Sequence, residues 1–142
     1  MDLPKNEKSF HFKHAGELTG RIYEGEFLVK CVLNLADKRT LEVEKSALSL
    51  DLTNPSGNLA AISDVVANLR VRVIDSPDWF KQAVNSLDIL DDELFFEVYG
   101  ECLEASAAWV DKVKGKAADK DADLQRDSEG NSSKESLTSS PS

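Results

Sequence analysis

An apolar repeat between residues 91 and 113 constrains this chain more than any other pattern in its sequence. Mostly apolar side chains follow one another at alternating steps of four and three, namely Phe95, Tyr99, Cys102, Ser106, Trp109 and Val113. That spacing places them on one face of an α-helix. Carboxylates occupy the other side, and Asp91-Asp92-Glu93 suits the positive end of the helix dipole. The sequence therefore predicts a helix over 91–113 with one apolar packing face.

The N-terminal part of the chain has the alternation of β-structure instead. Residues 17–33 predict a β-hairpin, because apolar side chains alternate over 26–33 and Glu24-Gly25 is a good pair for a tight turn. Residues 9–13 alternate as well and are the candidate third strand.

Helical spacing between the hairpin and the last helix predicts three shorter helices, over 37–51, 59–74 and 77–86. The end of the second, 69–74, also alternates like a strand, but Pro77 after a longer helical pattern favours helix through Ile74. Ser76 is the expected N-cap of the third, with Pro77 at its first position.

These elements predict an α+β fold: the N-terminal hairpin followed by a small bundle of three to four helices. One globular domain is expected over 1–113. Residues 114–142 are rich in Ser and in charges of both signs, with few apolar side chains. They cannot bury enough apolar surface to offset their ordering entropy, so a disordered polar tail is expected there.

The net charge of −9 is confined to one segment. Residues 75–111 hold ten acids and only Lys81 as a base, whereas the segments on either side are neutral. This balance argues against nucleic acid and against a membrane surface as partners. With no apolar run of about 20 residues, no signal-peptide pattern and only Cys31 and Cys102 as thiols, a cytoplasmic protein with buried, reduced cysteines is expected.

The residues that could support catalysis or metal binding form weak patterns. His11 and His14 with the distant Cys31 and Cys102 are a poor zinc signal, because metal ligands must converge. The adjacent carboxylates of 91–93 indicate a helix start and a solvated face, and no phosphate-binding Gly-rich loop or nucleophile elbow is present. No enzyme activity, cofactor or metal is expected.

The aromatic side chains near the acids are the candidate partner-binding residues, and ordinary core packing is the competing interpretation. On one helix, neighbouring side chains such as Phe95 and Phe96 point about 100° apart, so a single groove does not readily bury both. An aromatic stripe beside an acidic ridge would dock a partner helix and select basic ones. The candidates are Trp79, Phe80, Phe95, Phe96, Tyr99 and Trp109, with Glu97, Glu101 and Glu104 as the ridge.

The order of several short stretches over residues 17–112 resembles tail assembly chaperones of long-tailed bacteriophages. These stretches are Gly20-Arg21-Ile22-Tyr23-Glu24-Gly25-Glu26-Phe27-Leu28-Val29-Lys30, Asn58-Leu59-Ala60-Ala61-Ile62, Ser76-Pro77-Asp78-Trp79-Phe80, Leu87-Asp88-Ile89-Leu90-Asp91, and the closing helix with Ala105, Ala108 and Trp109. The resemblance implies a non-catalytic protein that binds the tape-measure protein and helps deliver tail tube subunits. It also implies self-association, absence from the finished virion and, in many members, a longer frameshifted form. The hairpin departs from the more helical members.

Two other functions remain open on the sequence alone. A structural virion protein of the tail or connector would be retained in the particle, although tube proteins are built on longer sheets than this chain predicts. A cellular adaptor or regulatory domain would have no phage partner at all. A small hydrolase ranks last.

Overall fold

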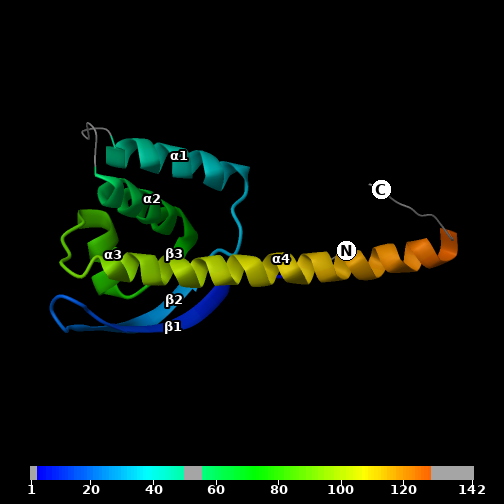
Figure 1. Ribbon diagram of the computed structural model, residues 1–142, viewed down its shortest axis with the longest axis horizontal. Helices are drawn as coiled ribbons and strands as arrows, with labels where there is room; N and C mark the ends of the chain where they lie inside the picture. Colours follow the sequence, from blue (N-terminus) through cyan, green and yellow to red (C-terminus); the bar gives the residue numbers. More distant parts are fainter. Residues whose placement is uncertain (1–2, 50–55, 129–142) are drawn as a thin grey trace. The chain divides into compact units, whose positions relative to one another are not determined.

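The computed structural model has the element order β1-β2-α1-α2-β3-α3-α4 and describes residues 3–49 and 56–128 (Figure 1). Its side chains are described as far as Gly115. Residues Lys5–Trp109 form one compact unit, and the packing given below is that of this unit. Val110 and the residues after it belong to another. A three-stranded antiparallel sheet that is built on an N-terminal hairpin, together with four helices, confirms the predicted α+β class.

The sheet is built on a regular hairpin. β1 (Lys8–Ala15) pairs with β2 (Ile22–Val29) from Lys8↔Val29 to Ala15↔Ile22, which confirms a strand over 9–13. The short β3 (Val73–Asp75) pairs antiparallel to the other edge of β2, next to a register irregularity at Leu28 and Val29. The strand order is therefore β1-β2-β3.

The predicted hairpin turn at Glu24-Gly25 is wrong, because both residues lie inside β2 and pair with β1. The chain instead reverses over residues 16–21, where Gly20 has a positive φ of 74° and its N–H donates to the Gly16 carbonyl at 2.8 Å. Gly25 serves packing: a Cβ there would lie 2.1 Å from Cγ of Pro77. Gly25 is therefore explained by the close approach of two segments and not by a turn.

Three helices lie close to their predicted ranges: α1 (Leu35–Ser49), α2 (Gly57–Arg72) and α3 (Asp78–Ser86). Residues 50–51 of the first predicted helix lie outside the described residues. The second prediction is wrong at its end, since Val73 and Ile74 leave the helix and join the sheet. The predicted cap is also wrong: Pro77 caps α3 without a side-chain hydrogen bond. Figure 1 shows α1 alongside α2.

The helix α4 (Glu93–Ser128) begins two residues later than predicted and continues past residue 113. The disordered segment predicted from 114 therefore does not agree with the helical backbone through Ser128, and residues 129–142 lie outside the described part. Lys and Ala each occur three times over 114–125, and their intrinsic preference favours helix even without an apolar face. No helix in the described part of the chain is both long and apolar enough to cross a membrane.

One hydrophobic core joins the sheet to α2, α3 and α4. Its buried members include Phe12, Tyr23 and Phe27 from the sheet, Leu69 from α2, Phe80 from α3, and Leu94, Phe95 and Val98 from α4. Phe80 sits at the centre, with its ring centroid 4.9 Å from that of Phe27 and 6.1 Å from that of Phe95. α1 contributes no buried side chain and reaches this core only through the partly buried Leu48.

Candidate functional site

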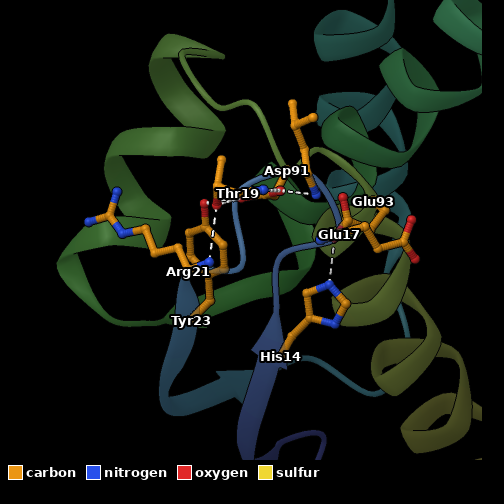
Figure 2. Close-up of polar contacts among 8 residues, drawn as sticks. His14, Glu17, Thr19, Arg21, Tyr23, Asp91 and Glu93 are labelled. Atoms are coloured by element: carbon orange, nitrogen blue, oxygen red, sulfur yellow. Dashed lines mark hydrogen bonds and ion pairs between the residues drawn. The ribbon is translucent and has the colours of Figure 1, made fainter.

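A buried carboxylate joins the start of α4 to the hairpin turn. Asp91 precedes α4 and has no exposed surface. Its Oδ1 accepts the backbone N–H groups of Leu18 and Thr19 at 2.8 and 3.0 Å, and its Oδ2 accepts the Thr19 hydroxyl and the Tyr23 hydroxyl. Figure 2 shows the carboxylate of Asp91 pointing into the turn between these donors. The interaction holds residues 18–19, 73 and 72 positions earlier in the chain, against the start of α4.

The hydrogen bonds to Asp91 stabilise its ionised form. The Thr19 hydroxyl contributes most, and together with the other donors it lowers the pKa of Asp91 to about 2, although burial opposes the shift. All the groups that donate hydrogen bonds to Asp91 belong to the fold, and its carboxyl group is ionised at neutral pH. The carboxylate therefore holds the hairpin turn against the start of α4 and has no proton to donate. The expectation that residues 91–93 form a solvated face is therefore wrong for Asp91.

Glu93 makes the second link between α4 and the turn. Its Oε2 lies 2.7 Å from Nε2 of His14 and accepts the N–H of Glu17 at 2.9 Å (Figure 2). Burial raises the pKa of Glu93, but the bonds from His14 and Glu17 outweigh it and leave the pKa below its ordinary value. His14 thus belongs to β1 and is partly buried.

The predicted aromatic candidates divide between core and surface. Phe80 and Phe95 are buried and belong to the hydrophobic core, so neither is open to a partner in this conformation. Trp79, Tyr99 and Trp109 are partly buried and pack against that core. Only Phe96 is exposed, at 38% of its surface. The apolar repeat at steps of four and three residues, which predicted α4, therefore marks the face of the helix that packs in the hydrophobic core.

A second apolar strip lies on α4 next to the buried face. Phe96, Gly100, Leu103 and Ala107 follow at steps of four, three and four, and Leu103 is 45% exposed. This spacing stacks their side chains along one side of the helix. A Cβ at Gly100 would meet no neighbouring atom, so the glycine leaves the strip open, and no close helix contact explains it. We call these four residues the α4 strip.

The acidic residues of α4 border the α4 strip. Glu97 and Glu104 are exposed and lie about 100° round the helix from Phe96 and Leu103, so they form one flank of the strip. Glu101 is partly exposed and lies further round the helix. No ion pair joins these three carboxylates to any described residue. The arrangement is an apolar strip with an unneutralised negative edge, which suits an apolar surface with positive charges.

The remaining candidate, Trp79, lies at a cavity on a different part of the protein. The cavity measures about 510 Å³ and lies between the hairpin turn, α3 and the loop before α4. Its residues are Thr19, Arg21, Tyr23, Trp79, Gln82, Ala83, Asp88, Ile89 and Leu90. The indole of Trp79 is 5.2 Å from the Tyr23 ring and donates its N–H to the Glu24 carbonyl at 3.0 Å. We call this space the Trp79 cavity.

The histidines and thiols do not form a metal site in the described part of the chain, where no group of three or more His, Cys, Asp or Glu side chains could hold a metal ion. His11 instead bridges Glu26 and Glu24 on an exposed part of the sheet, and these two hydrogen bonds raise its pKa. Neither cysteine forms a disulfide and both are buried, as predicted, and burial raises the pKa of Cys102 to about 12.

Sequence reasoning missed Leu103, Leu90 and Arg21. Leu103 follows Phe96 by seven residues, so a second apolar periodicity was present but was hidden by the stronger one beside it. Leu90 and Arg21 come together only because Asp91 holds the turn next to the loop before α4. No local sequence pattern predicts that two segments so far apart in the chain lie side by side.

Comparison with protein-family models, curated proteins and solved structures finds no match for this chain.

Proposed function

We propose that this protein is a non-catalytic binding protein that captures a basic amphipathic helix on the α4 strip. The observation that carries the proposal is the pair of exposed large side chains, Phe96 and Leu103, beside the unpaired carboxylates of Glu97 and Glu104. Phe96 is 38% and Leu103 is 45% exposed, so a helix that buried the remaining surface would gain roughly 0.6–1.3 kcal/mol from each side chain. Lysine or arginine on its flank would meet the acidic edge.

The charge of the strip favours a partner of different sequence over a second copy of α4. Two α4 strips facing each other would bring Glu97 and Glu104 of one copy near the same acids of the other, and like charges at close range are destabilising. Self-association, which the resemblance implies, would accordingly use another surface. A basic helix satisfies the apolar strip and the acidic edge together.

The resemblance to tail assembly chaperones gives this binding function a specific form. In that form the captured helix belongs to the tape-measure protein, and the chain keeps it soluble in the host cytoplasm and assists the arrival of tail tube subunits. An apolar strip with a charged edge suits this role, because it binds an amphipathic helix while the charge keeps the free protein soluble.

The test is titration calorimetry with a purified helical fragment of the tape-measure protein from the same genome. The doubly substituted Phe96→Ala/Leu103→Ala variant should bind about tenfold more weakly, because each substitution removes a contact worth about 1 kcal/mol. Val43→Ala is the matched control, since Val43 is a 66% exposed apolar side chain on a different helix, α1. Unchanged affinity of the folded double variant would exclude the strip.

Charge substitutions test the acidic edge separately. Glu97→Gln/Glu104→Gln should weaken binding and reduce its dependence on salt, whereas Glu7→Gln/Glu42→Gln, with the same change in net charge, should do neither. If a Lys-rich amphipathic peptide binds the strip and the tape-measure fragment does not, the protein is a helix-binding adaptor and not a tail chaperone. Detection of the chain in purified virions would also contradict the chaperone role and favour a structural tail or connector protein.

A further inference from the structure

The loop between α3 and α4 holds two leucines, Leu87 and Leu90, whose side chains are exposed and so add little to the core of the fold. Leu87 ends α3 in the left-handed conformation, with φ 62° and ψ 16°, where glycine is usual and a side chain is strained. Its side chain is nevertheless 47% exposed, and that of Leu90 is 71% exposed. Backbone strain that is not offset by burial of the side chain is typical of functional sites, so this loop is a candidate functional site.

The loop forms one edge of the Trp79 cavity. Leu90 and Ile89 line it together with the rings of Tyr23 and Trp79, which gives the cavity an apolar wall. The opposite edge is the hairpin turn, which the Asp91 carboxylate holds in place through Thr19. The cavity is therefore preformed, and its volume of about 510 Å³ falls in the range of ligand sites.

Three polar side chains at this cavity have no hydrogen bond or ion pair with another described residue: Arg21, Gln82 and Asp88. The guanidinium of Arg21 only lies over the Tyr23 ring, 5.6 Å from its centroid. Arg21 is thus an exposed cation without a counter-ion, in a protein whose net charge is −9. A ligand carboxylate would supply that counter-ion, and Gln82 and Asp88 can bond main-chain N–H and C=O groups.

We propose that the Trp79 cavity binds an extended segment of a partner protein that combines a bulky apolar side chain with a neighbouring carboxylate. The apolar side chain enters between Trp79, Ile89 and Leu90, while the carboxylate pairs with Arg21. This site does not depend on the α4 strip: its ligand is extended and acidic, whereas the strip takes a basic helix.

The probes are four blocked peptides, Ac-Gly-X-Z-Gly-NH2, in which X is Leu or Ala and Z is Glu or Lys. Binding to the full chain is followed by NMR through the indole N–H resonance of Trp79, and Trp109, which does not line the cavity, is the reference in the same spectrum. The Leu-Glu peptide should bind with a Kd of the order of 1 mM, and the Ala-Glu peptide about tenfold more weakly. Absence of any Trp79 shift with all four peptides would overturn the proposal.

Substitutions then place the ligand. Arg21→Ala should abolish the preference for Glu over Lys, and Leu90→Ala should weaken Leu-Glu binding about fivefold through the lost apolar contact. Arg39→Ala and Val43→Ala, both exposed on α1, are the matched controls and should change neither value. A preference for Glu that survives Arg21→Ala, or an affinity that Leu90→Ala leaves unchanged, would overturn the proposal.

Two further variants test the backbone strain at Leu87 and whether the chain's own C-terminus occupies the Trp79 cavity. Leu87→Gly should raise the melting temperature by relieving the left-handed conformation. A Leu87→Gly variant no more stable than the parent would contradict the strain argument. The chain also contains Glu135-Ser136-Leu137. If Leu137→Ala shifts the Trp79 resonance in the absence of peptide, the chain's own C-terminus fills the cavity, and a separate partner segment is excluded.

Discussion

Gly16→Ala tests the link between the hairpin turn and α4 more directly than any other substitution. A Cβ at Gly16 would lie 2.3 Å from both Cγ and Oδ2 of Asp91 and 2.7 Å from Oδ1. Such separations do not occur between non-bonded atoms, so the carboxylate or the turn must move. Gly16 does not have a positive φ, unlike Gly20, so alanine meets only this steric obstacle.

The expected cost follows from the hydrogen bonds that this movement breaks. Displacing the carboxylate separates Oδ1 from the N–H groups of Leu18 and Thr19, which are now 2.8 and 3.0 Å away. Hydrogen bonds to a charged group contribute about 1.5–3 kcal/mol each, so losing two lowers the free energy of unfolding by at least about 3 kcal/mol. For a domain of this size, that loss lowers the melting temperature by roughly 12 °C or more.

Gly100→Ala is the matched control, because the same chemical change meets open space in the middle of α4. Alanine is favoured over glycine inside a helix by up to about 1 kcal/mol, so this variant should be more stable than the parent. Urea unfolding followed by circular dichroism measures both variants on one scale. Opposite signs are expected, with a difference of about 4 kcal/mol between the two.

A double-mutant cycle identifies the clash as the cause. In an Asp91→Ala background the carboxylate atoms that Gly16→Ala would meet are gone, so the same substitution should cost little. If Gly16→Ala is as stable as the parent, the close approach of turn and carboxylate is refuted. If its cost persists without the Asp91 carboxylate, the turn itself rejects alanine and the packing argument is refuted.

Two predictions concern pH. Asp91 has a pKa of about 2 in the fold against 3.8 ordinarily, so its contribution to stability is complete above about pH 4 and is lost as the pH falls through 2. The urea concentration at the midpoint of unfolding should therefore fall over this pH range in the parent protein. It should fall less in Asp91→Asn. His11 should titrate above 6.5 by NMR, so its contribution is present below that pH and is lost as the pH rises through the folded pKa. Glu26→Gln should lower the His11 pKa more than Glu24→Gln, because the Glu26 bond is the larger cause; equal effects would contradict the geometry.

The fold was predictable where one face of an element repeats in sequence. The pattern through Phe95 and Cys102 located α4; these two residues are core, and Tyr99 and Trp109 pack against it. Prediction failed where the same residues suit two structures. Val73 and Ile74 continue a helical pattern and also alternate, and their pairing with β2, more than 40 residues earlier, decides for the strand.

The candidate sites were predictable only in part, because exposure depends on which face the rest of the chain covers. The sequence placed Phe96 among the candidates beside the acidic ridge, but it did not distinguish Phe96 from Phe80 and Phe95, which are both buried. The anchoring role of Asp91 was hidden for a different reason. Its donors lie in a turn some 70 residues earlier, and next to two other acids it has the composition of an ordinary helix start.

The acidity of residues 75–111 divides into two kinds once each carboxylate has a place. Asp91 and Glu93 are bound by the hairpin turn, and Asp75 pairs with Lys81 at 3.2 Å, so these charges stabilise the fold. Glu97 and Glu104 have no such partner among the described residues and lie on the exposed side of α4. Because a cluster of unpaired like charges on one helix face is mildly destabilising, neutralising it should not weaken the fold. Loss of binding in Glu97→Gln/Glu104→Gln therefore cannot be attributed to unfolding, which makes this acidic edge the more decisive place to test for a partner.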